Sequence, residues 1–219
     1  MGIDAVVFDM DGLMFDSETI WCEAWARAFE KNGLVEQPGL LATFTGSSRE
    51  RVQGLILAAY DGDRRALRVC DDHFAIAEDV FGEKGAPAKP GLFELLDWLS
   101  VTGIPCAVAS GSPRSVVEAV LGHAGLGGLF SAVIAGDDGL PSKPAPDVFL
   151  AAASRLGAEP ARALVLEDSP TGIRAAAAGG LMPVMVPDLV EPTAEIRGLS
   201  AHVCGSLLEV RDLLATGVL

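Results

Sequence analysis

The sequence has few basic residues and no long apolar run, and each of these absences excludes a class of protein. Only 16 Lys and Arg residues stand against 30 Asp and Glu residues, which gives a formal net charge of −14. Nucleic acids and anionic membranes bind clustered basic residues, so we expect neither as a partner. No apolar stretch reaches the roughly 18 residues that span a bilayer. The N-terminus shows no leader pattern, so we expect no targeting segment.

Cysteine is also scarce, and its spacing argues against both zinc sites and disulfides. The four cysteines form no C-x-x-C pair and lie far apart, at Cys22, Cys70, Cys106 and Cys204. Reduced thiols in a cytoplasmic protein are the expectation. The sequence does not determine the oligomeric state, and a monomer is compatible with it.

What the sequence does contain is an alternation of short apolar runs with helical patterns. The apolar runs are AVVFD, CAVAS, AVIAG, ALVLE and PVMVP. Near-continuous apolarity is typical of parallel strands buried on both faces. Ser112 and Ser169 each precede a proline, which predicts that both serines cap the helices that follow. The pattern predicts an α/β fold, with helices on both faces of a parallel sheet.

One connection is too long to be a simple crossover between strands. About 95 residues separate the first two predicted strands, whereas a crossover needs only about a dozen. Most of this segment has helical patterns. We therefore interpret residues 17–87 as a helical insert with GAPAKPG as its return linker, and residues 1–16 with 88–219 as the domain that contains the sheet.

Polar side chains follow the predicted strands where parallel sheets bind their ligands. They come from four strand ends: Asp9 and Asp11, then Ser110, then Lys143, then Glu167 and Asp168. Residues i and i+2 of an extended chain point to the same side. Both carboxylates of D-x-D can therefore face the ligand-binding end of the sheet while Met10 enters the core. The set of side chains predicts phosphoryl transfer.

Each residue type has a chemical reason to be at such a site. Carboxylates from two strand ends suit Mg²⁺, and a carboxylate can also attack phosphorus. The cation and Lys143 would offset repulsion between the nucleophile and a small phosphorylated substrate, and Ser110 would hydrogen-bond a phosphoryl oxygen. Gly12 would let the backbone approach the ligand closely. A bound Mg²⁺ ion explains how an acidic protein could bind an anionic phosphorylated substrate.

Four segments together resemble the haloacid dehalogenase (HAD) superfamily, in its branch of phosphatases and β-phosphoglucomutase-like enzymes. These segments are FDMDGLMFDSE, ASGS, SKPAPD and LEDSPTGI, which extend from residue 8 to residue 173. The resemblance implies a Rossmann-like core with an inserted cap of four helices. It also implies Asp9 as nucleophile and Asp11 as acid/base, with Ser110 and Lys143 on the phosphoryl group. Mg²⁺ would be held by Asp9, the backbone carbonyl of Asp11, and Asp168, with Glu167 close by. Gly12, Gly111 and Ser112 would line the substrate site.

The cap segment bears on which member of the family this is. TGSSRERV resembles the substrate-gripping loop of the mutase, with Gly46, Ser47 and Arg49 at matching positions. Arg49 could hold a second phosphate or form a surface ion pair. Trp21 replaces the mutase's hinge histidine; it could line the cleft, although packing among helices is the preferred interpretation.

Pro113-Arg114 also stands where the mutase has a Lys-Asn pair, and the mutase's cap lysine has no counterpart. These departures from the mutase pattern favour a Mg²⁺-dependent phosphatase of a small phosphorylated metabolite, such as a sugar phosphate. The alternatives are a phosphohexomutase and a catalytically silent binding module.

Overall fold

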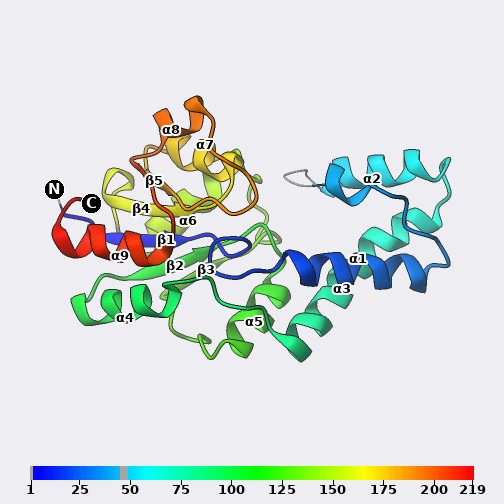
Figure 1. The fold of residues 1–219 in the computed structure, drawn as a ribbon, viewed down its shortest axis with the longest axis horizontal. Helices are drawn as coiled ribbons and strands as arrows, with labels where there is room; N and C mark the ends of the chain where they lie inside the picture. The colour runs from blue at the N-terminus through cyan, green and yellow to red at the C-terminus, as the bar shows by residue number, and fades with distance from the viewer. Residues whose placement is uncertain (1, 45–48) are drawn as a thin grey trace.

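The computed structural model describes residues 2–44 and 49–219, and its centre is a six-stranded parallel sheet (Figure 1). The strand order is β3-β2-β1-β4-β5-β6. The strands are β1 (Ala5–Phe8), β2 (Cys106–Ala109), β3 (Ala132–Ile134), β4 (Ala163–Glu167), β5 (Met182–Met185) and β6 (His202–Val203). The first four lie within the predicted apolar runs, and β5 begins one residue before the run PVMVP. The short edge strand β6 was not predicted.

Helices cover both faces of the sheet, as the sequence predicted. Alternate residues of the central strands enter two separate clusters: Val6 and Phe8 of β1 pack on one face, and Ala5 and Val7 on the other. The first cluster includes residues of α4 (Leu92–Thr102), α5 (Arg114–His123) and α9 (Leu207–Thr216). The second includes residues of α6 (Asp147–Arg155) and α7 (Pro170–Ala178). The short helix α8 (Ala194–Leu199) packs beside α7.

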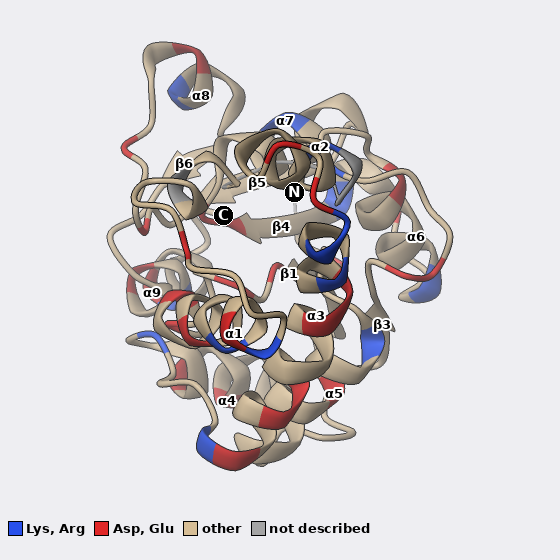
Figure 2. Ribbon diagram, turned by 90° about the vertical axis from the view of Figure 1, so that its right-hand side faces the viewer, with Lys and Arg blue, Asp and Glu red and all other residues tan. Residues whose placement is uncertain are grey.

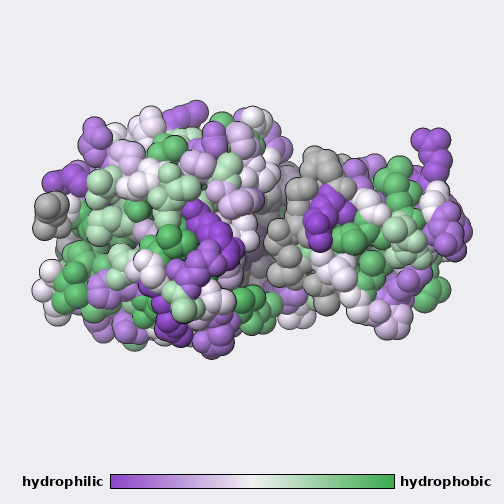
Figure 3. Space-filling model, turned by 90° about the horizontal axis from the view of Figure 1, so that it is seen from above, coloured by the Kyte–Doolittle hydropathy of each residue, from purple (hydrophilic) through white to green (hydrophobic). Residues whose placement is uncertain are grey.

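Residues between β1 and α4 form a helical part beside the sheet. Its elements are α1 (Glu18–Lys31), the 3-10 helix η1 (Leu41–Thr43), α2 (Arg49–Ala59) and α3 (Arg65–Lys84). These α-helices extend away from the sheet in Figure 1, and the surface narrows where the two parts join (Figure 3). The helical part has its own apolar cluster, centred on Trp25, Phe29 and Val69. Four helices were expected here, and the described residues contain three α-helices and one 3-10 helix.

The chain crosses between the two parts twice, and the two crossings are hydrogen-bonded to each other. The N–H of Asp16 donates to the carbonyl of Pro87 at 2.8 Å. The N–H of Lys89 donates to the carbonyl of Met14, also at 2.8 Å. No helix in the described part of the chain has the length and apolarity needed to cross a membrane.

Candidate active site

The sheet order brings the predicted polar residues to one edge, which we call the carboxyl edge. Strand β1 lies between β2 and β4, so the residues after these three strands are neighbours. Met10 is fully buried in the core, whereas Asp9 and Asp11 on either side of it contact polar groups at the carboxyl edge. The alternation expected for D-x-D is therefore present.

Asp9, Lys143 and Glu167 form a buried ion-pair network. Nζ of Lys143 donates to Oδ1 of Asp9 and, at 2.7 Å, to Oε1 of Glu167. Burial raises the pKa of Asp9 to about 7; the ammonium of Lys143 opposes this rise and the carboxylate of Glu167 adds to it. Burial alone would lower the pKa of Lys143, but Asp9 and Glu167 outweigh burial and raise it. Lys143 therefore stays charged at neutral pH.

The carboxylate of Asp11 accepts hydrogen bonds at both oxygens. Its Oδ2 accepts from Oγ of Ser112 at 2.8 Å and from Oγ of Ser110 at 3.4 Å. Its Oδ1 accepts from Nε1 of Trp21 at 2.8 Å. Trp21 belongs to α1, so the helical part contacts the carboxyl edge directly. Three donors from two parts of the fold thus orient this carboxylate.

The start of α7 holds Glu167 in place. The N–H and hydroxyl of Ser169 donate to Oε2 of Glu167 at 2.8 and 2.9 Å. The hydroxyl of Ser169 also accepts from the N–H of Gly172, which confirms the predicted N-cap. A Cβ on Gly172 would lie 1.8 Å from Oε1 of Glu167, so this position requires glycine.

Asp168 approaches the backbone of Gly12 closely. A Cβ on Gly12 would lie 2.4 Å from Oδ2 of Asp168, and Gly12 has a φ of +82°, so a side chain is excluded on two grounds. Burial raises the pKa of Asp168 to about 9, and the carboxylates of Glu167 and Asp9 contribute to the rise.

The charge balance of these residues fits a divalent cation. Three carboxylates, from Asp9, Glu167 and Asp168, lie around the single ammonium of Lys143. The raised pKa values of Asp9 and Asp168 reflect this excess of negative charge together with burial. Within the described ranges no three His, Cys, Asp or Glu side chains converge as a complete cage. Mg²⁺ does not need one, because it keeps several waters and binds through one or two carboxylates. Acidic residues are also widespread outside the site (Figure 2).

The structure does not place every predicted site residue. Gly46 and Ser47 lie outside the described residues, and so does the side chain of Arg49. Gly111 is exposed beside the buried Ser112, and its carbonyl would lie 2.0 Å from a Cβ on Gly136.

The prediction that Ser112 caps the helix after β2 is wrong. The cap position of α5 is Pro113, and no side chain there accepts a capping hydrogen bond. The hydroxyl of Ser112 donates to Asp11 instead.

Three residues near the site were missed or underrated. Trp21 packs against His73, Phe74 and Phe81, as preferred from the sequence, but its indole also reaches Asp11. Lys89 and Asp188 form an ion pair beside the carboxyl edge. The sequence offered no local signal for either contact, because 10 residues separate Trp21 from Asp11 and 99 separate Lys89 from Asp188.

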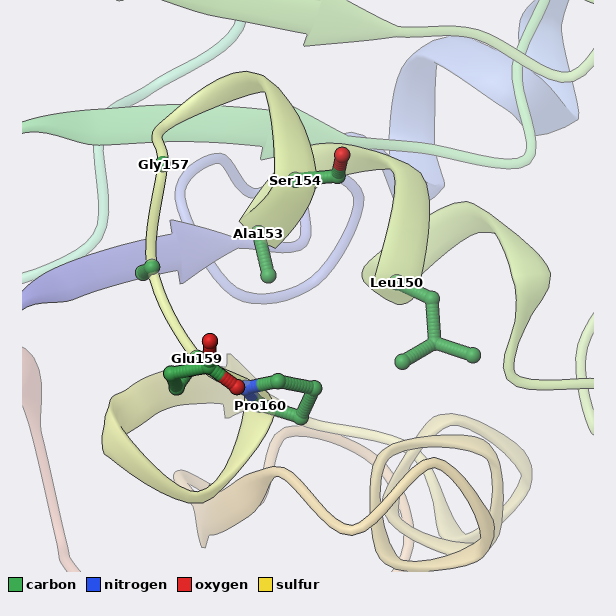
Figure 4. A pocket seen from close by; sticks show the side chains of 7 residues that line it. Leu150, Ala153, Ser154, Gly157, Glu159 and Pro160 are labelled. Atoms are coloured by element: carbon green, nitrogen blue, oxygen red, sulfur yellow. The ribbon is translucent and has the colours of Figure 1, made fainter.

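A shallow hollow elsewhere on the surface is not part of the site. It has a volume of about 460 Å³ and is lined by the end of α6 and the segment before β4 (Figure 4). Its residues include Leu150, Ser154 and Pro160. Since Pro160 precedes β4 and Glu167 ends it, the hollow lies at the opposite end of the strands from the carboxyl edge.

Carboxylates, hydroxyls and an ammonium at one end of a parallel sheet are the groups that phosphoryl transfer requires. A family model described as haloacid dehalogenase-like hydrolase matches residues 3–180. The chain belongs to this family of hydrolases.

Known proteins with similar sequences and structures include phosphatases. The fructose-1-phosphate phosphatase YqaB of Escherichia coli strain K12 is 33% identical over 184 residues, which are 80% of this chain and 92% of the relative. A probable pseudouridine-5'-phosphatase of Drosophila melanogaster is 34% identical over 194 residues, or 83% of this chain and 80% of that protein. CbbY from Rhodobacter sphaeroides, crystallised with phosphate, has a TM-score of 0.82 and 25% identity, covering 95% of this chain and 96% of its own. The predicted family, fold class and enzymatic nature are confirmed.

Proposed function

We propose that the protein is a Mg²⁺-dependent phosphatase that hydrolyses a small phosphorylated metabolite through an aspartyl-phosphate. The observation that carries this proposal is the position of Lys143. Its ammonium joins Asp9 to Glu167 at the edge of the sheet where Asp11 and Asp168 also lie.

Asp9 is the proposed nucleophile. One of its carboxylate oxygens attacks phosphorus, the bond from phosphorus to the substrate oxygen breaks, and Asp11 gives a proton to that oxygen. Water then attacks the phosphorus of the aspartyl-phosphate, Asp11 takes up a proton from this water, and inorganic phosphate leaves. Lys143 and Ser110 contact the phosphoryl oxygens and offset their charge.

A Mg²⁺ ion would be held by Asp9, the backbone carbonyl of Asp11, and Asp168, with Glu167 beside them. When bound, it supplies positive charge that offsets repulsion between the phosphate and the carboxylates. The raised pKa values of Asp9 and Asp168 support this assignment, because they mark a place where negative charge is under-compensated.

We further propose that residues 17–87 act as a cap on a core formed by residues 1–16 and 88–219. The hydrogen bond from Trp21 to Asp11 supports this arrangement of cap and core, because Trp21 belongs to a helix of the insert and Asp11 is the proposed acid/base. Closure of such a cap would exclude bulk water before phosphoryl transfer.

A sugar phosphate is the proposed substrate class. The names of the similar phosphatases support it, since fructose 1-phosphate and pseudouridine 5'-phosphate both carry a phosphate on a sugar. For the mutase alternative, Arg114 is relevant: Pro113 and Arg114 follow the second motif, where the mutase has a Lys-Asn pair, and the guanidinium of Arg114 pairs with Asp138 at 2.8 Å. A surface partner engages Arg114, which favours the phosphatase.

The test is phosphate release from a panel of phosphorylated metabolites, with Mg²⁺ and with EDTA. The panel includes β-glucose 1-phosphate with a coupled readout for glucose 6-phosphate. Mg²⁺-dependent release from a few compounds is the expected result. Isomer formation with little release would indicate the mutase instead, and no turnover of any compound would indicate the silent module.

A further inference from the structure

An ion pair outside the proposed catalytic set joins the segment after α3 to the loop after β5. Nζ of Lys89 lies 2.6 Å from Oδ1 of Asp188. The two side chains are only 23% and 18% exposed. Water and salt therefore screen this pair less than they screen ion pairs on the open surface.

The backbone of Lys89 is fixed as well as its side chain. Its N–H donates to the carbonyl of Met14, next to the hydrogen bond from Asp16 to Pro87. Lys89 therefore belongs to the paired crossings between the helical part and the sheet, and its ammonium extends from there to the loop that carries Asp188.

The second oxygen of Asp188 approaches the proposed cation site. A Cβ on Gly12 would lie 3.4 Å from Oδ2 of Asp188 and 2.4 Å from Oδ2 of Asp168. Both oxygens lie close to the same point, so they are within about 6 Å of each other. At such a distance the charge of one carboxylate acts on the other, because the site is only partly accessible to water.

We propose that Lys89 is a positioning residue that acts through Asp188: its ammonium compensates the charge of Asp188 beside Asp168. The proposal rests on the proposed function only in taking a divalent cation and a phosphate as the ligands of this edge. Without Lys89, Asp188 would add one uncompensated negative charge next to a site that already has an excess. That charge would attract the cation and repel the phosphate.

The charge model predicts opposite effects for the two halves of the pair. Lys89→Met leaves the carboxylate alone, so Mg²⁺ should bind more tightly and phosphate more weakly. Asp188→Asn leaves the ammonium alone, so both effects should reverse. The double variant restores the charge balance although the contact is lost, so its affinities should return toward those of the wild type.

The experiment is calorimetric titration of Mg²⁺ and of inorganic phosphate into the wild type, both single variants and the double variant. We expect each single variant to change each affinity about fivefold, in opposite directions, as one unit charge does at a partly screened distance. The double variant should lie within about twofold of the wild type. Lys84→Met is the matched control, because Lys84 pairs with Glu23 at 2.6 Å on the helical part, and it should change neither affinity.

A pure structural link would give a different pattern. The two single variants and the double variant would then shift the affinities in the same direction and by similar amounts, and this result would overturn the proposal. Unchanged affinities in both single variants would also overturn it. If Lys89→Met does not fold, as judged by circular dichroism, two other variants test the proposal. Asp188→Asn should shift the affinities, whereas Lys89→Arg keeps the charge and should not.

The outcome is separable from that of the proposed function. In one outcome the wild type releases no phosphate from any substrate while the single variants still shift the Mg²⁺ and phosphate affinities in opposite directions. That result would refute the phosphatase function and support the role of Lys89. An active wild type without these shifts would remove only the role of Lys89.

Discussion

The indole Nε1 of Trp21 donates a hydrogen bond to Oδ1 of Asp11 at 2.8 Å, and this contact joins the helical part to the carboxyl edge. The same indole packs edge-on against Phe81, with ring centroids 5.4 Å apart. Trp21 therefore has two separable functions: its ring packs among the helices, and its N–H orients the proposed acid/base.

Trp21→Phe should remove the hydrogen bond while keeping most of the packing. A hydrogen bond to a charged carboxylate contributes roughly 1.5–3 kcal/mol, so we expect kcat/KM to fall about tenfold or more. Steady-state kinetics on the best substrate of the panel measures this effect. Trp25→Phe is the control, because the indole of Trp25 stacks on His73 at 3.7 Å within the helical part. A loss of kcat/KM in Trp25→Phe as large as in Trp21→Phe would contradict a specific role for the Asp11 contact.

Lys143→Met should destabilise the fold as well as abolish activity. Removing this ammonium leaves the buried carboxylates of Asp9 and Glu167 without their cation, and breaking a buried pair in this way costs ~3–5 kcal/mol. Urea unfolding without divalent ions measures the loss. For comparison, Lys31→Met removes an exposed pair with Asp72, and it should cost ~1 kcal/mol or less. Equal losses in the two variants would refute the buried network as a source of stability.

The metal-free protein should lose stability as the pH rises, and Mg²⁺ should restore it. The pKa values of Asp9 and Asp168 are raised to about 7 and about 9, so the folded protein holds protons that the unfolded chain releases near pH 4. These protons stabilise the fold at low pH; their contribution falls as the pH rises above about 4 and is lost once the pH has passed those two values. Because a cation competes with the same protons, the increase in Tm caused by Mg²⁺ should be larger at about pH 9 than at about pH 6. Thermal unfolding with Mg²⁺ and with EDTA tests this, and a smaller increase at the higher pH would count against the proposed ligands.

Gly172→Ala should be poorly tolerated although the residue lies in a helix. Its Cβ would meet the carboxylate of Glu167 at 1.8 Å, and such overpacking costs ~1–3 kcal/mol. A Cβ on Gly82 in α3 would meet no neighbouring side chain within 4 Å in the described part of the chain, so Gly82→Ala should stabilise the protein by ~0.5–1 kcal/mol. Urea unfolding compares the two variants. If both stabilised the protein, the close approach of α7 to Glu167 would be refuted.

Much of the fold was predictable because its signals are local. Five strands have near-continuous apolar runs, and the polar residues that follow four of them were identifiable from their residue types. The edge strand β6 contains only His202 and Val203, which is too short for any periodicity to show. The proposed cap residues Gly46 and Ser47 lie outside the described residues, so their role stays a prediction.

The contacts that sequence reasoning missed are long-range. Ser112 has the local pattern of a helix cap, but its hydroxyl is used by Asp11, which is 101 residues away in the chain. Asp188 belongs to no motif. It lies beside the carboxyl edge only because β5, which precedes it, pairs with β4. A local pattern predicts what a residue can do, and the fold decides which of the competing partners it meets.

The measurement that tests the central claim most directly is the activity of Asp9→Asn with the best substrate of the panel. Asp9 is the proposed nucleophile, so kcat should fall by on the order of a thousandfold or more, with circular dichroism unchanged. The exposed Asp16→Asn controls for the substitution itself and should retain normal turnover. Near-normal activity of a folded Asp9→Asn variant would contradict the account.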